Sequence, residues 1–295
     1  MGFLSYVAVS NELTRNRIQR NLAGNIHGIA RLNSLAIRAN GSRSLIGENN
    51  GVRHRRVGLQ KQKVYLPAKV SGKSMHLFIV GGEEMEEELR AKFGVGHSYD
   101  FCTADAPDLL TRLGAADVGF DLREWPELHY EQPRQPLFYA IGARSLAHLF
   151  HKEAPPFGPV FGLCALPTLL NREHLEVSLF QEDDTEKLAE TCAALGTKFL
   201  TVPDRVGLLS PRLACVFINE ACYLLQEAGA SLSDIEQTMR LRLGVPQGPL
   251  AWANAIGLGQ VYLLLEALYQ ETHEDRYKPC PLLRYHYLRG QSFEL

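Results

Sequence analysis

The sequence of 295 residues lacks two features that would narrow its class at once. It has no uninterrupted apolar run near the roughly 18 residues that a membrane-spanning helix needs, so we expect no membrane segment. It also has no CxxC spacing, which argues against a zinc ribbon or a dithiol redox motif. We therefore predict that the cysteines are buried free thiols of a reducing compartment and hold no metal. The six cysteines are Cys102, Cys164, Cys192, Cys215, Cys222 and Cys280.

Acidic residues are scarce at the start of the chain. Residues 1–74 hold 13 Lys and Arg against only Glu12 and Glu48, a net charge of +11, while the remainder holds 31 acidic against 18 basic residues, or −13. We interpret residues 1–74 as a disordered or mis-assigned extension, with Met75 as the natural start of a cytoplasmic protein. Two alternatives stay open: a transit peptide, which would make the protein organellar, and a basic arm that binds nucleic acid or a membrane.

Strand-like and helix-like segments alternate between residues 75 and 203. This order predicts an α/β domain with a mostly parallel sheet that is covered on both faces. Apolar segments predict strands at 76–80, 99–105, 116–122, 136–142, 159–166, 174–180 and 198–202. Helices are predicted at 83–94, 107–115 and 184–196. The polarity of 174–180 alternates, which is typical of a half-buried strand.

Residues 204–295 are almost wholly helical in pattern, which predicts a second, all-α domain. Helices are expected at 211–230, 231–244 and 258–273, with 245–257 as a connection rich in Pro and Gly. Ser233 followed three residues later by Glu236 has the spacing of a capping box at the start of the second helix.

The segment GVPQGPLAWANAIGL, at 244–258, carries a specific resemblance. It resembles the pattern G-x-P-x-G-P-F-x-x-x-D-x-x-G-L of the 3-hydroxyacyl-CoA dehydrogenase family, with Leu250 in place of Phe and Asn254 in place of Asp. The preceding NEACYLLQEAGASLSDIEQTMRLRLG is similar to the same family. The resemblance implies a shortened Rossmann-like domain at 75–203, followed by a helical-bundle domain like the C-terminal domain of 6-phosphogluconate dehydrogenase. It also implies NAD-dependent oxidation of a 3-hydroxyacyl-CoA and a homodimer through the helical domain.

The family's catalytic His falls on Cys164 in the segment FGLCALPTLLNREHLEVSLF, at 161–180. Glu176 falls on the Glu that orients this His, twelve residues further on. A thiol with an ordinary pKa of about 8.5 is a poor proton acceptor and has no second ring nitrogen for a Glu to hold. Substrate-binding positions also differ: Arg144 stands for a Ser and Pro211 for an Asn, while Ser145 is kept.

The predicted nucleotide turn is VGGEEMEEEL, at 79–88. A Rossmann turn needs G-x-G-x-x-G, which lets backbone N–H groups approach the pyrophosphate. Gly81 and Gly82 are the candidate cofactor-binding residues, yet either register places glutamates at the next two glycine positions. Asp105, near the end of the second strand, is interpreted as a turn residue rather than a ribose ligand. We therefore predict no cofactor, and NAD only if the chain is active.

Three functions fit these residues. The favoured one is a degenerate family member that binds an acyl-CoA or another protein without catalysing oxidation. The second is an active but diverged dehydrogenase of fatty-acid metabolism, and the third an enzyme with Cys164 as nucleophile and His174 or His148 as base. We expect no nucleic acid on the folded part, because the aromatic residues of the helical domain are interpreted as core or dimer surface. These are Trp252, Tyr262, Tyr269, Tyr285 and Tyr287.

Overall fold

The computed structural model describes residues 64–65, 74–123, 134–151, 158–243 and 247–295, without the side chains of 64–65 and 242–243. All of these residues lie in one compact unit, Gln60–Leu295. Most of the predicted N-terminal extension, 1–74, lies outside these described ranges. Within the described part, no helix is long and apolar enough to cross a bilayer.

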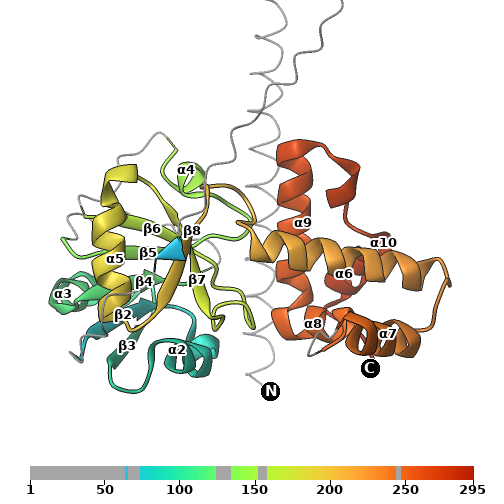
Figure 1. Ribbon diagram of the computed structural model, residues 1–295, viewed down its shortest axis with the longest axis horizontal. Coiled ribbons are helices and arrows are strands. Elements are labelled where there is room, and N and C mark those ends of the chain that lie inside the picture. The colour runs from blue at the N-terminus through green and yellow to red at the C-terminus, as the bar shows by residue number, and fades with distance from the viewer. Residues whose placement is uncertain (1–63, 66–73, 124–133, 152–157, 244–246) are drawn as a thin grey trace, which may run out of the picture. The chain divides into compact units, whose positions relative to one another are not determined.

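An eight-stranded sheet forms the α/β part, in the order β1-β8-β7-β6-β5-β4-β2-β3 (Figure 1). The strands are β1 (Val64–Tyr65), β2 (His76–Val80), β3 (Ser98–Cys102), β4 (Val118–Asp121), β5 (Leu137–Ala140), β6 (Val160–Leu163), β7 (His174–Leu179) and β8 (Lys198–Thr201). Five neighbouring pairs are parallel, and only β6–β7 and β1–β8 are antiparallel. The predicted mostly parallel sheet is confirmed. The sheet also takes β1 from the segment that the sequence assigned to the extension.

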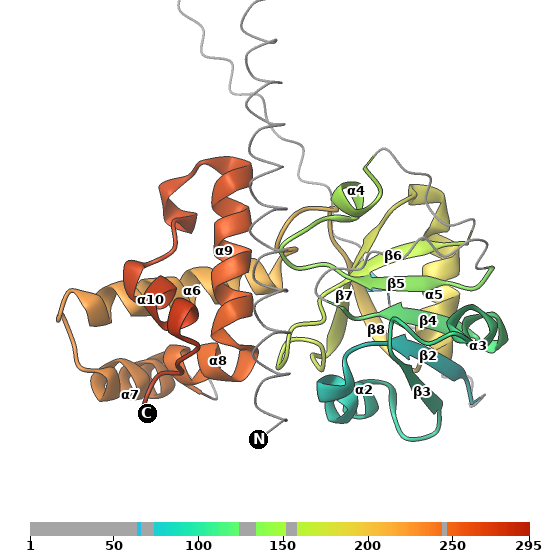
Figure 2. The same ribbon diagram turned by 180° about the vertical axis from the view of Figure 1, so that it is seen from behind.

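Helices cover both faces of this sheet, as the alternating pattern predicted (Figure 2). The helices are α2 (Glu86–Phe93), α3 (Leu109–Ala115), α4 (Leu146–Leu149) and α5 (Thr185–Ala194), with short 3-10 turns η1 (Glu83–Met85) and η2 (Glu182–Asp184). Successive residues of β2 point to opposite faces, as in any strand. Leu77 packs in one core with α2 and α5, and Phe78 in a second core with α3 and α4.

The prediction that β7 is half-buried is wrong. Its residues Leu175, Glu176, Val177 and Ser178 are all buried, although two of the four are polar. Leu175 and Val177 face the core under α2 and α5. The opposite face is closed because the Glu176 carboxylate accepts hydrogen bonds from the backbone of 209–210, and the Ser178 hydroxyl lies 3.4 Å from Asp204 Oδ1. Polar side chains therefore alternate here without reaching solvent.

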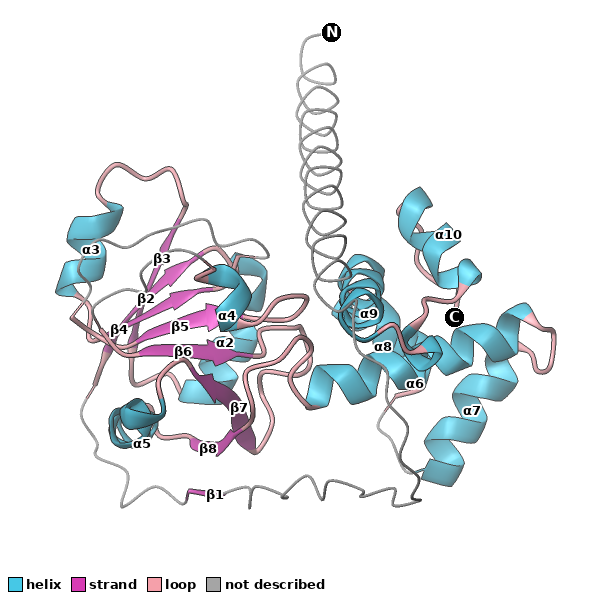
Figure 3. Cartoon of the chain, turned by 90° about the horizontal axis from the view of Figure 1, so that it is seen from above, coloured by secondary structure: helices cyan, strands magenta, loops and turns pink. Residues whose placement is uncertain are grey.

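Five helices form the C-terminal part (Figure 3). They are α6 (Ser210–Gln226), α7 (Leu232–Leu243), α8 (Pro249–Ile256), α9 (Leu258–Thr272) and α10 (Pro281–Arg289), with a 3-10 turn η3 (Asp275–Tyr277). The predicted helical C-terminal region is confirmed, but 245–257 is not a simple connection because α8 lies within it. Pro249 occupies the first turn of α8, where a missing N–H costs nothing, so proline starts this helix instead of preventing it.

The predicted capping box at Ser233 is also wrong. Ser231 caps α7, because its hydroxyl accepts from Asp234 N at 3.2 Å and lies 2.6 Å from Asp234 Oδ2. Glu236 instead accepts from the N–H groups of Leu250 and Ala251, in the first turn of α8. The carboxylate thus joins two helices, and a fourteen-residue separation hid this role from a local pattern.

A buried amide connects α6 to the chain that leads into α10. Asn219, only 4% exposed, donates from Nδ2 to the carbonyl of Lys278 at 2.8 Å and accepts from Cys280 N at 2.8 Å. A buried backbone group left without its partner costs roughly 1–3 kcal/mol. This amide therefore fixes the segment 278–280 against α6.

We expect Asn219→Ala to lower the free energy of unfolding by roughly 1–3 kcal/mol, because it leaves a carbonyl and an N–H unpaired. The measurement is urea unfolding of the full chain followed by circular dichroism. Gln237→Ala is the matched control, since the Gln237 side chain makes only an exposed hydrogen bond to Ser233. Equal midpoints for the two variants would show that the Asn219 bridge contributes nothing.

Candidate functional site

The structure brings Cys164 and Glu176 together, as the resemblance implied. Cys164 directly follows β6, and the antiparallel register pairs Leu163 with Val177 on β7. Glu176 therefore lies opposite Cys164 on the neighbouring strand. Cys164 and Glu176 are thus neighbours across the two strands, at the end of β6.

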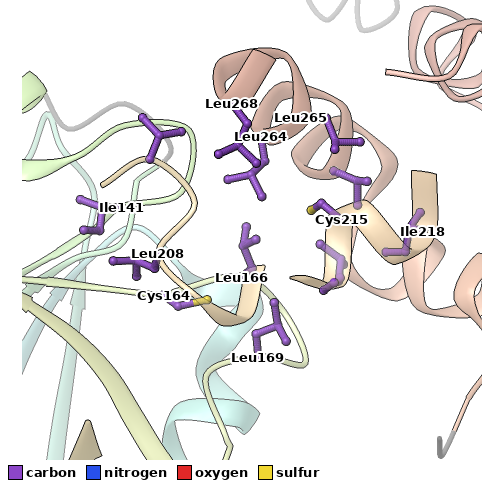
Figure 4. Packing of buried hydrophobic residues seen from close by; sticks show 14 of the residues in the cluster. Ile141, Cys164, Leu166, Leu169, Leu208, Cys215, Ile218, Leu264, Leu265 and Leu268 are labelled. Carbon is purple, nitrogen blue, oxygen red and sulfur yellow. The ribbon is translucent and has the colours of Figure 1, made fainter. Parts of the chain in front are cut away.

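Cys164 lies in a dry apolar environment (Figure 4). Its side chain is 3% exposed and belongs to one continuous core cluster that includes residues from both the sheet and the helices. Figure 4 also labels other members of the same cluster, namely Ile141, Leu166, Leu169, Leu208, Cys215, Ile218, Leu264, Leu265 and Leu268. Burial, and secondarily the charge of Glu176, raises the pKa of the Cys164 thiol to about 12. The thiol is therefore protonated at neutral pH and is neither a base nor a nucleophile.

The Glu176 carboxylate caps the N-terminus of α6. Its Oε2 accepts from Ser210 N at 2.9 Å, its Oε1 accepts from Ser210 N at 3.2 Å, and Oε1 also accepts from Leu209 N. The first N–H groups of a helix have no partner within the helix and carry partial positive charge. The Glu176 carboxylate is only 8% exposed. It is stabilised by the N–H groups of Leu209 and Ser210, which follow the last strand of the sheet.

The loop between Cys164 and β7 is held from two sides. On one side Glu88 of α2 accepts from Thr168 N at 2.8 Å and from Asn171 N at 2.9 Å. On the other side Trp252 of α8 donates from Nε1 to Thr168 Oγ1 at 2.7 Å. Thr168 has a positive φ of 70°, an uncommon conformation for a residue with a branched Cβ. These contacts hold that conformation and close the chain around Cys164.

The remaining substrate positions of the family serve local structure. Ser145 caps the short helix α4, and its hydroxyl lies 2.9 Å from His148 Nδ1. Pro211 is buried in the first turn of α6, where it supplies no side-chain donor. Arg144 is half-buried in the turn before α4.

The two histidines and Asp105 are dispersed. His148 is exposed and belongs to the α4 cap, while His174 starts β7 opposite Lys198. Asp105 is exposed, three residues beyond the end of β3. In the described part of the chain, no three His, Cys, Asp or Glu side chains are grouped closely enough to hold a metal ion.

Gly81 and Gly82 form the turn after β2, both with positive φ, 69° and 71°. A Cβ on Gly81 would lie 2.8 Å from Cγ of Arg123, and one on Gly82 would lie 2.8 Å from Leu122. The chain that follows β4 therefore packs directly on this turn. Arg123 donates to the buried carboxylate of Asp121 at 2.8 and 2.6 Å, which fixes its side chain there.

Carboxylates dominate the segment that leaves this turn. Glu83 and Glu84 lie in η1, and the first turn of α2 holds three more glutamates. The negative charges of these glutamates stabilise the partial positive charge at the N-terminus of α2. Sequence reasoning found the glycines and the acidic run but missed the roles of Glu88, Thr168, Trp252 and Arg123. No local signal distinguishes Glu88 from its solvated neighbours, because its partners lie 80 or more residues away.

The sequence similarity to known proteins lies mainly in the helical C-terminal part. Residues 207–292 match the family model "3-hydroxyacyl-CoA dehydrogenase, C-terminal domain". The chain is 40% identical over 99 residues to 3-hydroxyadipyl-CoA dehydrogenase of Escherichia coli K12, covering 34% of this chain and 21% of that protein. It is 38% identical over 101 residues to a probable 3-hydroxybutyryl-CoA dehydrogenase of Bacillus subtilis, covering 34% of each. The matches therefore span between a fifth and about a third of these relatives' length.

Two solved structures share the fold over most of the described chain. The M. tuberculosis protein FadB2 aligns with a TM-score of 0.60 at 18% identity, over 75% of this chain and 96% of that one. The (S)-3-hydroxybutyryl-CoA dehydrogenase PaaH1 of Ralstonia eutropha aligns with a TM-score of 0.58 at 20% identity, over 74% and 95%. The α/β part thus has the expected fold, and residues 207–292 are similar to the C-terminal domain of the 3-hydroxyacyl-CoA dehydrogenase family.

Proposed function

We propose that this chain is a non-catalytic member of the family, whose helical domain serves protein association. One observation carries the proposal: the position of the family's base is a protonated thiol inside the core, and the paired carboxylate caps α6. General acid–base catalysis is commonly worth ~10²–10⁴ in rate, and neither group is available to supply it. The same burial argues against Cys164 as a nucleophile. In addition, neither candidate histidine is paired with the thiol in the described structure.

The turn at Gly81 and Gly82 does not fit a dinucleotide. A pyrophosphate needs close approach to backbone N–H groups at a helix start. Here Arg123 and Leu122 pack on the two glycines, and five glutamates follow within seven residues. Two phosphate charges beside these carboxylates would be repelled. No step of the proposed function therefore uses NAD.

An apolar stripe on α6 supports association through the helical domain. Leu213 is 64% exposed and Leu224 is 38% exposed, with the half-buried Phe217 between them. Residues four apart lie on one face of a helix, and Leu213, Phe217 and Leu224 fall at spacings of four and seven. Figures 1 and 2 show α6 crossing α9 on one side only, so its other face is uncovered by the helices of its own domain. We infer that two copies of the chain pack through this face of α6 to form a homodimer.

Leu213→Glu is expected to convert the dimer to a monomer, because it places a charge at the most exposed residue of the apolar stripe. Light scattering after size exclusion of the full chain measures this as a fall from twice the chain mass to the chain mass. Leu110→Glu is the matched control, since Leu110 on α3 is 57% exposed but lies on a different helix of the α/β part. A wild-type chain that is monomeric would contradict the dimer.

Cys164→His tests the lost base directly. The variant is expected to show no NADH formation from 3-hydroxybutyryl-CoA, and to lose roughly 1–3 kcal/mol of stability because a polar ring overfills a closed apolar site. The wild-type chain is expected to leave NADH fluorescence unchanged and to give no heat with acetoacetyl-CoA. Micromolar NADH binding, or turnover by either chain, would establish an active dehydrogenase. Heat with acetoacetyl-CoA alone would show an acyl-CoA-binding protein.

Glu176→Gln separates a structural role of this carboxylate from a vestigial one. The variant keeps the size of the side chain but removes the charge from the N-terminus of α6, and we expect a loss of about 1–2 kcal/mol. The control is Glu173→Gln, because the Glu173 side chain is 72% exposed and only pairs with Lys198. Equal urea midpoints for the two variants would mean that the cap does not stabilise the chain.

A further inference from the structure

A surface pocket of about 160 Å³ lies in the helical domain, away from the positions of the family's dyad. It is formed by one face of α9, the chain that leads into α10, and the first turns of α10. The lining residues are Tyr262, Glu266, Tyr269, Lys278, Pro279 and Arg284. Two aromatic rings and two cations thus converge on one small volume.

Two parts of this pocket, the backbone of 278–280 and the Tyr262 ring, are held in place by contacts within the helical part. Asn219 holds the backbone of Lys278 and Cys280 from beneath through two hydrogen bonds of 2.8 Å. The Tyr262 ring stacks on Tyr287 of α10, with centroids 4.5 Å apart and an interplanar angle of 15°. A rigid wall lowers the entropic cost of binding, because fewer side chains must be ordered.

The two cations have no carboxylate partner within the described part of the chain. The nearby Arg276 pairs with Glu274 at 2.6 Å, whereas no ion pair of the described residues involves Lys278 or Arg284. The one acid of the pocket, Glu266, accepts from Gln270 Nε2 at 2.9 Å. The pocket therefore carries two positive charges against one negative charge.

We propose that this pocket binds a small aromatic monocarboxylate of about the size of benzoate. A cavity of ~150 Å³ is large enough to hold a benzene ring, which matches the volume here. The tyrosine rings offer apolar faces for an aromatic ring, and the ammonium of Lys278 and the guanidinium of Arg284 donate charge-assisted hydrogen bonds to a carboxylate. Inorganic phosphate has no ring for the tyrosines to contact, so the pocket favours an aromatic carboxylate over phosphate.

The site is independent of the proposed association through α6, and it uses none of the family's dyad or nucleotide positions. Its residues come from α9, α10 and the chain between them, while the apolar stripe consists of Leu213, Phe217 and Leu224 on α6. A chain that proves monomeric, or even catalytically active, would leave the ligand prediction unaffected.

Titration of the full chain with benzoate, followed by saturation-transfer NMR and calorimetry, tests the proposal. We expect benzoate to bind, and its neutral isostere benzamide and inorganic phosphate to bind at least tenfold more weakly. Lys278→Gln and Arg284→Gln are each expected to weaken benzoate binding roughly tenfold, because each removes one charge-assisted hydrogen bond. Arg289→Gln is the matched control, since Arg289 lies on the same helix but stacks on Tyr285, outside the pocket.

Retained affinity in Arg289→Gln, together with loss in the two pocket variants, supports the site. Equal affinity in all three variants would overturn it, because benzoate would then bind elsewhere. Equal binding of benzamide and benzoate would also overturn it, since the cations would play no part. All three positions are exposed charges, so circular dichroism is expected to show an unchanged fold in every variant.

Discussion

The hydrogen bonds from the start of α6 to the Glu176 carboxylate are the contact on which the arrangement of this protein depends. A carboxylate inside an apolar core is costly unless donors satisfy it, and here the donors are the N–H groups of Leu209 and Ser210. They fix the start of the longest helix of the C-terminal part against β7. The other helices in turn pack on α6, so this acidic side chain joins the two halves of the structure together with the Trp252–Thr168 hydrogen bond and the shared apolar cluster.

The same contact leaves little room for chemistry at the dyad positions. A carboxylate that already accepts three hydrogen bonds from the backbone has little capacity left to orient a base, and Cys164 beside it lies among leucines (Figure 4). The loop of Thr168 closes this region from both sides, through Glu88 and Trp252. On our proposal, the residues at positions that bind or act on substrate in the family contribute to packing in this chain. Polar side chains remain there only where their hydrogen bonds stabilise the fold.

The acidic segment after β2 illustrates how one composition can serve two purposes. Most of its glutamates lie at the surface, where they complement the N-terminal end of α2. Glu88 alone turns towards the loop of Thr168 and satisfies two backbone N–H groups there. The glycines before this segment are required by the turn itself, since both have positive φ and contact the chain after β4. The turn is thus a packed structural element.

The sequence by itself determined all the described strands except β1, most helices, the burial of all six cysteines and the likeness of residues 207–292 to one family. These properties follow from local periodicity and from Gly and Pro spacing, which act over a few residues. Only the tertiary structure decided that β7 is buried on both faces, that Ser231 rather than Ser233 caps α7, and that Glu176 caps α6. The burial of β7 and the role of Glu176 depend on residues that are far away in the sequence. The cap of α7 depends on which of two nearby serines lies at the start of the helix. A polar group in a core takes whichever donor the fold brings to it.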